Sequence, residues 1–469
     1  MSETDVSNSV HQPVNLKRSM RRIGVLLLTL SYITPAASVF IIAPGVVQQA
    51  GTGAAISFIA AAFISLCVAF AYAELGSAFP LTGGEYAVVA RVLGAFPGFL
   101  ILGLNVITLI LITAVMALGI GDYLGAFLPG IAPVWLGVLC VFFATLCGLL
   151  HIRTNAWVTG LFLLAEVAVL LVLAALGFLH VERPLADVLF YPLNLGASGG
   201  LEPVTLGAIG LATVVANFAY NGYGNAVYLG EEMHEAPRHL GRLIILSLFI
   251  AVVAEAVPVT AMLLGAPDLK ELFASHAMIT DFIRARGGER LSTFVSLGIA
   301  FAIFNADIAT IVLIGRQVYS TGRDQVWTPR INRALTQLHK RFHSPWLATL
   351  IPGMLACAAC FIGLDRLLVV TGTSLVVVYV ALCVSVIVGR RSGKTAHGLY
   401  RMPLYPLPPI AGLCALAYVI YANYLDTAIG RPSLVATGGM MLLAAAYYGL
   451  VLRRRGVWQP RMDAPDDDI

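Results

Sequence analysis

The chain has 469 residues, of which 59% are hydrophobic and only 12% are charged, and its mean hydropathy is +0.86. These values lie outside the range of a soluble globular domain of this length and predict an all-α membrane protein. The formal net charge of +4 therefore bears on membrane topology, and we expect no nucleic-acid partner.

Stretches of about 20 apolar residues, the length that crosses the hydrocarbon core, predict about twelve transmembrane helices. In chain order they lie near 23–50, 54–73, 95–119, 134–151, 155–179, 206–230, 243–265, 291–316, 346–363, 367–388, 406–425 and 434–452. The first is longer than the apolar region of a signal peptide, so we expect it in the mature protein. The remaining ends, 1–22 and 453–469, are expected to be cytoplasmic tails around a single transporter domain at 23–452.

The first and the sixth of these stretches are interrupted in their middles. Pro35 and Pro44 interrupt the first, and the run Tyr220-Asn221-Gly222-Tyr223-Gly224-Asn225 interrupts the sixth. An unsatisfied backbone group in hydrocarbon costs several kcal/mol, so such breaks are tolerated where they line a cavity or meet a ligand. We expect residues 34–40 and 219–225 to be non-helical and to face each other across a midplane cavity.

The spacing of the two breaks indicates an internal repeat of five helices. An odd number of spans reverses the direction of the second copy, so 23–179 and 206–388 would be inverted repeats. The helices at 406–452 are then appended to them. In this architecture one part of the bundle moves against the other around a central site.

Lysine and arginine residues gather on one side of the predicted bundle. With the N-terminus inside, 22 of the 29 fall in inner segments, which predicts a multi-pass protein of the cytoplasmic membrane with both termini in the cytoplasm. The stretch after the eighth helix is counted as an inner loop, and it includes Arg316 and Arg323.

Three acids lie deep in apolar sequence: Glu166, Glu255 and Asp307. A charge at the bilayer centre costs at least about 2.5–3.5 kcal/mol, so intramembrane acids are candidates for function. A carboxyl group in apolar surroundings can exchange a proton near neutral pH. Because no lysine or histidine lies near a helix centre, a carboxylate must carry any coupling proton at the midplane.

Each acid has an alternative role. Glu166 and Glu255 could be permanently protonated and bonded to a neighbouring backbone carbonyl. Asp307 could instead face the broken first helix and complete a cation site for sodium or a substrate ammonium group, or serve only in packing.

Several local motifs, in order along the chain, resemble those of the amino acid, polyamine and organocation (APC) superfamily. Ala73-Glu74-Leu75-Gly76-Ser77-Ala78-Phe79-Pro80-Leu81-Thr82-Gly83-Gly84-Glu85-Tyr86 resembles the ELxxxxPxxGGxY signature of that superfamily. Phe218 to Gly224 is similar to its broken sixth helix, with Glu231-Glu232 at the inner end, and Arg316-Gln317-Val318-Tyr319-Ser320-Thr321-Gly322-Arg323-Asp324 is similar to its RxxYxxGRD segment. The resemblance covers nearly the whole chain and implies a LeuT-like secondary transporter.

The resemblance also implies roles for single residues. Phe218 matches an aromatic gate, Asn305 matches an asparagine of the eighth helix, and Glu166 stands where some proton-coupled members carry a lysine. The first helix departs from the usual Gly-Ser-Gly break and reads Thr34-Pro35-Ala36-Ala37-Ser38. This form is closer to branches that also carry amines. The expected substrate contacts are Thr34, Ala36, Ala37, Ser38, Phe218, Tyr220, Asn221, Gly222 and Tyr223.

These observations together predict a transporter of an amino acid or a related amine that is coupled to protons and works by alternating access in the lipid bilayer. An ion-independent exchanger and a sodium symporter are the alternatives within this class, and a channel or membrane receptor is the alternative outside it. We expect no enzyme and no cofactor, because no nucleophile with a matched base is present. Cys357 and Cys360 lack a second ligand pair, so we expect no metal site.

Overall fold

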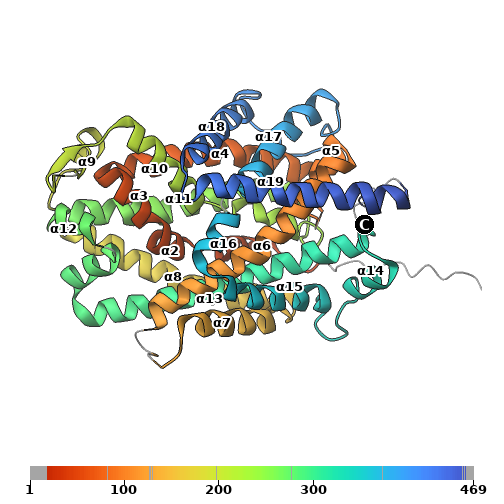
Figure 1. Cartoon of the computed structure of the whole chain (residues 1–469), viewed down its shortest axis with the longest axis horizontal. Helices are drawn as coiled ribbons and strands as arrows, with labels where there is room; N and C mark the ends of the chain where they lie inside the picture. Colours follow the sequence, from red (N-terminus) through yellow and green to blue (C-terminus); the bar gives the residue numbers. More distant parts are fainter. Residues whose placement is uncertain are drawn as a thin grey trace, which may run out of the picture.

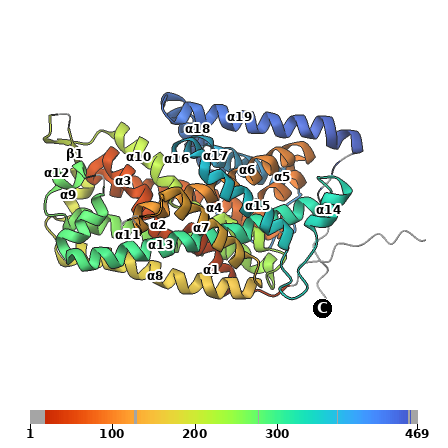
Figure 2. The same ribbon diagram turned by 60° about the horizontal axis from the view of Figure 1, so that its bottom comes forward.

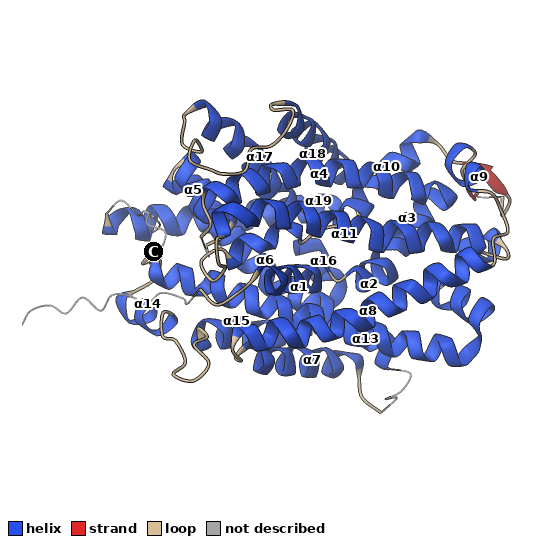
Figure 3. Cartoon of the chain, turned by 180° about the vertical axis from the view of Figure 1, so that it is seen from behind, coloured by secondary structure: helices blue, strands red, loops and turns tan. Residues whose placement is uncertain are grey.

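The computed structural model describes residues 18–81, 83–125, 128, 130–196, 198–275, 277–371, 373–456, 458 and 460. The predicted terminal tails lie mostly outside these residues. Within them the chain is almost wholly helical, and its two short strands, β1 (Leu193–Leu195) and β2 (Leu201–Pro203), form an antiparallel hairpin (Figures 1 and 3).

The N-terminal half of the chain contains the first broken helix and most of the long helices that follow it. Its helices are α1 (Arg22–Ile33), α2 (Pro35–Ala37), the π-helix η1 (Ser38–Ile42), α3 (Ala43–Ala50), the 3-10 helix η2 (Gly51–Gly53), α4 (Ala54–Ala78), α5 (Glu85–Leu93), α6 (Ala95–Leu124), α7 (Pro133–Gly148), α8 (Ile152–Leu179), α9 (Leu185–Phe190) and α10 (Leu206–Ala219).

The C-terminal half begins with the second broken segment. Its helices are the 3-10 helix η3 (Tyr223–Leu229), α11 (Ala236–Gly265), α12 (Leu269–Ala274), α13 (Met278–Arg323), α14 (Pro329–Leu335), α15 (Trp346–Ala359), the 3-10 helix η4 (Cys360–Ile362), α16 (Leu364–Thr371), α17 (Ser374–Arg391), α18 (Leu407–Leu425), α19 (Gly430–Tyr447), the π-helix η5 (Tyr448–Leu452) and the 3-10 helix η6 (Arg453–Arg455). Figure 2 shows α18 and α19 along one flank of the bundle.

By length and composition, eight helices in the described part of the chain can cross a membrane, and the shorter stretches 133–148 and 346–362 are also apolar. The protein is therefore an all-helical membrane protein. The predicted single span at 367–388 is wrong, because α16 ends at Thr371 and α17 begins at Ser374. There the backbone N–H and the hydroxyl of Thr373 bond to Ser433 Oγ, at 2.8 and 2.7 Å. Such side-chain contacts compete with helical hydrogen bonds.

The eighth predicted span, 291–316, is also too short, since α13 runs from Met278 to Arg323 with a kink at Gly288 (φ 81°). Its last turns carry Arg316 and Arg323, which are buried within the helix. The prediction that both arginines belong to an inner loop is therefore wrong. A charged side chain lowers hydropathy wherever it lies, so the apolar window ends at the first arginine even though the helix does not.

The bundle has two distinct ends. The described N-terminal residues Ser19 and Met20 bond to Glu232, and Trp458 near the C-terminus bonds to Asp324. This end, with α5 and α14, is called the termini end. The opposite end carries β1, β2, α9 and α12 and is called the hairpin end (Figure 1).

Small residues bring α8 and α11 into backbone contact. A Cβ added to Gly177 would lie 2.2 Å from the carbonyl oxygen of Ala261, and one added to Gly265 would lie 2.6 Å from that of Gly177. Close approach through small residues is the usual way in which transmembrane helices associate. These two helices flank the broken first helix and position its middle.

Candidate functional site

The break in the first helix is a single residue, Thr34, whose backbone is left-handed (φ 45°, ψ 69°). A β-branched residue rarely adopts this conformation. Because Pro35 has no N–H, the carbonyl of Ser31 also loses its helical donor. The chain is helical again from Pro35, through α2 and the π-helix η1. The prediction that all of 34–40 is non-helical is therefore wrong.

The backbone N–H groups that follow this break already have acceptors. The backbone N–H of Ser38 donates to the carbonyl of Thr34 (3.0 Å), and that of Ala36 is directed at the carboxylate of Glu166. Ala36 and Ala37 are buried inside the helical segment α2. A substrate carboxylate therefore finds the Ser38 amide already occupied.

The sixth predicted helix is broken only at Tyr220–Gly222, between α10 and η3. The prediction that all of 219–225 is non-helical is therefore wrong, because Ala219 ends α10 and 223–225 belong to the 3-10 helix η3. Gly222 is left-handed with φ 118°, and a Cβ there would lie 2.6 Å from Tyr32 Cδ1. Only glycine fits this position without strain. The Tyr220 hydroxyl donates to the carbonyl of Phe58 (3.2 Å), which holds the end of α10 against α4.

The two breaks face each other as predicted, but they are in direct contact. Ser38 Oγ donates to the carbonyl of Ala219 at 3.0 Å. On the other side of the break, Asn221 Oδ1 accepts a hydrogen bond from the Tyr379 hydroxyl (2.9 Å), and the rings of Tyr223 and Tyr379 stack with centroids 6.3 Å apart. Phe218 is half-buried in the last turn of α10.

Sequence reasoning named Tyr223 of the sixth-helix break but missed Tyr72 and Tyr379, which lie beside it. Tyr72 of α4 meets both Tyr223 and Tyr379 edge-on, with ring centroids 5.9 Å apart in each pair. Tyr72 and Tyr379 each lie in an apolar run of the sequence, so only the fold brings them beside Tyr223. The result is an aromatic wall with hydroxyl groups beside the break.

Glu166 of α8 is joined directly to the first break. Its Oε2 accepts from the Thr34 hydroxyl at 3.2 Å, and its Oε1 accepts from Asn305 Nδ2 of α13 at 2.8 Å. With the nearby Ala36 N–H, the carboxylate meets donors from three elements. It lies at the start of the helical segment that follows Thr34, where a negative charge is favourable.

This arrangement accommodates Glu166 with or without a proton. The Thr34 hydroxyl has one hydrogen and two acceptors in reach, Glu166 Oε2 and the carbonyl of Ala302 at 3.4 Å. When Glu166 is ionised, Thr34 donates to it. When Glu166 is protonated, its own O–H can donate to Thr34, which then donates to Ala302.

The other two acids lie apart from this contact. Asp307 Oδ2 accepts from the Cys140 thiol of α7 at 3.2 Å. Asn305 faces the first break through Glu166, and a side chain two positions further along the helix points in a different direction. The alternative in which Asp307 faces the broken first helix is therefore wrong. Glu255 of α11 is fully buried, and neither of its carboxyl oxygens has a hydrogen-bond partner among the described residues.

A buried ionic cluster lies at the termini end. Arg316 Nε lies 2.7 Å from Glu232 Oε1, with side chains only 1% and 5% exposed. Arg323 contacts both Glu231 and Asp324. Each arginine comes from α13 and each glutamate from the turn after η3, so the cluster ties the eighth predicted helix to the end of the broken sixth.

The sequence motifs converge on this cluster. The Tyr86 hydroxyl lies 2.8 Å from Asp324 Oδ2, and Gly84 (φ 62°) contacts the ring of Tyr228, where a Cβ would lie 2.5 Å from Tyr228 Cε1. The carbonyl of Glu232 accepts the backbone N–H groups of Ser19 and Met20, both at 2.9 Å. Among the described residues, contacts among α1, α5, α13 and the turn after η3 thus close the termini end.

At the hairpin end a pocket adjoins the breaks. A cavity of about 520 Å³ lies among η1, α6 and the start of α13, and its lining includes Phe40, Pro44, Tyr123, Arg284 and Glu289. Phe40 is two residues after Ser38, so this pocket lies next to the contact between the breaks. In the described part of the chain, a cavity thus adjoins the breaks on the hairpin side, while the buried ionic cluster lies on the termini side.

Comparison with known proteins agrees with this geometry. Residues 23–451 match the amino acid permease family. An uncharacterized transporter of Mycobacterium tuberculosis is 26% identical over 348 residues, 74% of each chain. A branched-chain amino acid permease of Bacillus subtilis is 22% identical over 464 residues, 94% of each chain. The human large neutral amino acids transporter small subunit 2 is 26% identical over 303 residues, 61% of this chain and 54% of that one.

Proposed function

The chain belongs to the amino acid permease family, and from that premise we propose that it carries a neutral amino acid across the cytoplasmic membrane by proton-coupled alternating access. We further propose twelve spans built as inverted repeats at 23–179 and 206–388, with the helices of 406–452 appended. The bias of lysine and arginine supports a cytoplasmic termini end, with tails at 1–22 and 453–469 on that side.

The substrate class is supported by the surroundings of the breaks. Tyr72, Tyr223 and Tyr379 supply apolar faces and neutral hydroxyls, and Glu166 already accepts hydrogen bonds from Thr34 and Asn305. The relatives named for branched-chain and large neutral amino acids point to the same class.

Substrate contacts are proposed at both breaks. The ammonium group would meet the carbonyl of Ser31, which Pro35 frees, and backbone carbonyls at 220–222. The Ser38 hydroxyl, which now bonds to Ala219, would turn to the substrate carboxylate. Phe218 would close over the substrate from the end of α10.

Proton coupling is proposed at Glu166, and its contact with Thr34 is the observation that carries the proposal. The carboxyl group bonds to the one residue at which the first helix is broken, and the Thr34–Ala302 contact accommodates both of its protonation states. Gain or loss of the proton therefore rearranges hydrogen bonds at the break itself. Glu255 and Asp307 remain the alternative proton carriers.

The experiment uses purified protein in liposomes, with radiolabelled leucine and an imposed pH gradient. One proton per substrate across one pH unit supports at most about tenfold accumulation, since a tenfold ratio corresponds to about 1.4 kcal/mol. The wild-type protein should approach this limit at equal sodium on both sides. Glu166→Gln should accumulate nothing above equilibrium yet still exchange internal for external leucine.

Glu255→Gln and Asp307→Asn are the matched controls, since each also neutralises a buried midplane acid. Both should keep pH-driven accumulation. Accumulation that persists in Glu166→Gln, or that follows sodium at fixed pH in the wild type, would contradict proton coupling at this residue. Thermal-shift measurements with amino acids and polyamines test the substrate class separately, because a ligand of the native state raises its stability.

A further inference from the structure

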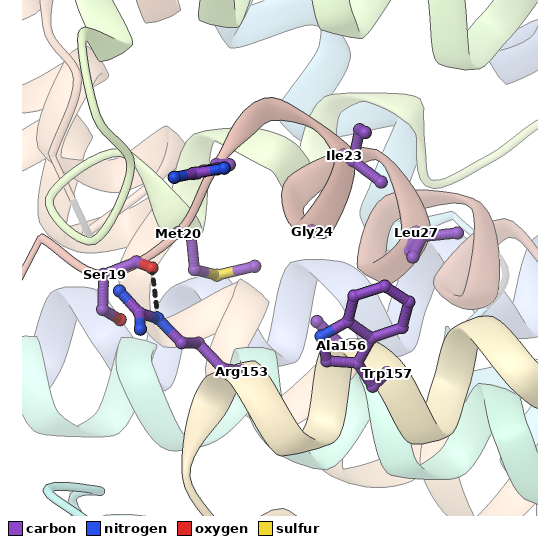
Figure 4. Close-up of a pocket in the computed structure, with 9 residues that line it drawn as sticks. Ser19, Met20, Ile23, Gly24, Leu27, Arg153, Ala156 and Trp157 are labelled. Atoms are coloured by element: carbon purple, nitrogen blue, oxygen red, sulfur yellow. Dashed lines mark hydrogen bonds between the residues drawn. The ribbon is translucent and has the colours of Figure 1, made fainter.

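A second pocket, outside the region of the breaks, lies at the termini end between the start of α1 and the start of α8. Its volume is about 350 Å³, and its walls include Met20, Gly24 and Leu27 on one side and Ala156 and Trp157 on the other. Figure 4 shows the Trp157 ring beside Leu27. None of these residues takes part in the contacts proposed for substrate or proton.

The apolar part of this pocket faces the lipid. Trp157 is 75% exposed and Ile23 is 68% exposed, and both belong to helices long and apolar enough to span the membrane. Exposed apolar side chains on such helices meet acyl chains, and tryptophan is enriched at the level of the headgroups. The pocket therefore opens sideways into one leaflet near its polar surface.

The polar part of the pocket is cationic. Arg21 and Arg153 line it, and no acidic residue lies among its described lining residues. Arg153 Nε donates to the carbonyl of Ser19 at 2.7 Å, as Figure 4 shows, and this bond fixes the guanidinium at the rim. The Arg21 side chain makes no hydrogen bond or ion pair with any described residue. Guanidinium groups recognise phosphate through paired N–H donors.

We propose that this pocket binds one anionic phospholipid. Its phosphate would lie between Arg21 and Arg153, and its acyl chain would run along Ile23, Leu27 and Trp157. Basic pockets between transmembrane helices on the cytoplasmic side bind anionic headgroups. A lipid, rather than a soluble phosphate, is indicated because the cationic rim continues into an apolar wall that faces the bilayer.

The position of the pocket gives the lipid a consequence for transport. Ser19 and Met20, which form one wall, are bonded to the carbonyl of Glu232, and the Met20 carbonyl accepts from the N–H of His234 (3.0 Å). A phosphate between Arg21 and Arg153 would hold the start of α1 against α8. The bound lipid should therefore favour the closed state of the termini end.

The test is quenching of Trp157 fluorescence by lipids with brominated acyl chains. The signal assigned to the pocket is the difference between the wild-type protein and Trp157→Phe, each in vesicles of phosphatidylcholine with added brominated phosphatidylglycerol or brominated phosphatidylcholine. Wild-type protein should prefer phosphatidylglycerol by at least about fivefold. Each arginine near the surface contributes about fivefold, which corresponds to about 1 kcal/mol.

Arg21→Gln should reduce the preference about fivefold, and Arg21→Gln with Arg153→Gln should abolish it. The matched control is Arg330→Gln with Arg333→Gln, which removes two exposed charges from α14 at the same end and should leave the preference unchanged. If the double variant misfolds, Arg21→Gln alone decides, because that side chain bonds to no described residue.

Two results would overturn the proposal. One is equal quenching by the two brominated lipids in the wild-type protein, or a preference that Arg21→Gln leaves unchanged. The other is displacement of brominated phosphatidylglycerol by soluble glycerol phosphate, which would make the pocket a site for free anions.

Discussion

The buried pair of Arg316 and Glu232 is the contact whose loss should open the termini end. Arg316→Gln leaves the Glu232 carboxylate buried without its counter-charge, and breaking such a pair costs about 3–5 kcal/mol. Once this end opens, water solvates Glu232, so the cost falls on the closed state alone. The ratio of closed to open molecules should then fall by a factor of about 100 or more.

Labelling of a cysteine behind the pair measures this ratio. Ser320 is fully buried at the termini end, and its hydroxyl lies 2.9 Å from that of Tyr86. In a variant without native cysteines, Ser320→Cys should react slowly with a membrane-impermeant maleimide added from the cytoplasmic side. Adding Arg316→Gln should raise the labelling rate about 100-fold, provided that opening and closing of the termini end are fast compared with the labelling reaction.

Two further variants separate opening from unfolding. Arg316→Gln with Glu232→Gln removes both charges, so no unpaired charge is buried, and the labelling rate should return to within a few-fold of the parent. Arg390→Gln breaks a different pair at the same end, with the buried Glu74, and should lower stability without faster labelling. A folded Arg316→Gln variant that labels at the parent rate would show that this pair does not hold the termini end closed.

Three other variants probe the breaks and one loop. Phe218→Ala should raise the KM for leucine while expression is unchanged, because a gate affects occlusion more than folding, and an unchanged KM would assign Phe218 to packing. Gly222→Ala adds a Cβ to a residue with φ 118° and brings it 2.6 Å from Tyr32 Cδ1, so the free energy of unfolding should fall by about 1–3 kcal/mol. The control is Gly438→Ala, where an added Cβ meets nothing within 4 Å and stability should not change. Burial raises the pKa of Asp426, but three backbone N–H groups outweigh it and hold the pKa below its usual value, so its contribution to stability is present at neutral pH and is lost as the pH falls below about 4. Melting curves of Asp426→Asn should lack this acid step.

The sequence predicted an all-helical membrane protein and the places of the two breaks, because both leave local signals. Apolar length marks each span, and Pro35 and Gly222 mark places where a helix cannot continue. The extent of the first break was overestimated because small residues such as Ala36 and Ala37 permit an irregular backbone without requiring one. In the structure they are helical, and Thr34 alone carries the left-handed conformation.

The contacts of the acids could not be predicted in the same way. The sequence marks Glu166 and Asp307 equally, as carboxylates in apolar helices, but the rotation of each helix decides what they meet. Glu166 meets Thr34 and Asn305, while Asp307 meets Cys140. These partners lie more than 130 positions away in the chain, so only tertiary packing distinguishes the two acids.

Because Thr34 alone separates α1 from the helical segment that follows, α1 can rotate as one rigid element about this residue. The helix has 12 residues and is therefore about 18 Å long, so a rotation of about 10° about Thr34 moves its N-terminal end by about 3 Å. That displacement equals the length of the hydrogen bonds by which Ser19 and Met20 hold Glu232. Because the Thr34 hydroxyl bonds to Glu166, the proposed gain or loss of a proton at Glu166 would act at this point of rotation and would displace Ser19 and Met20 most.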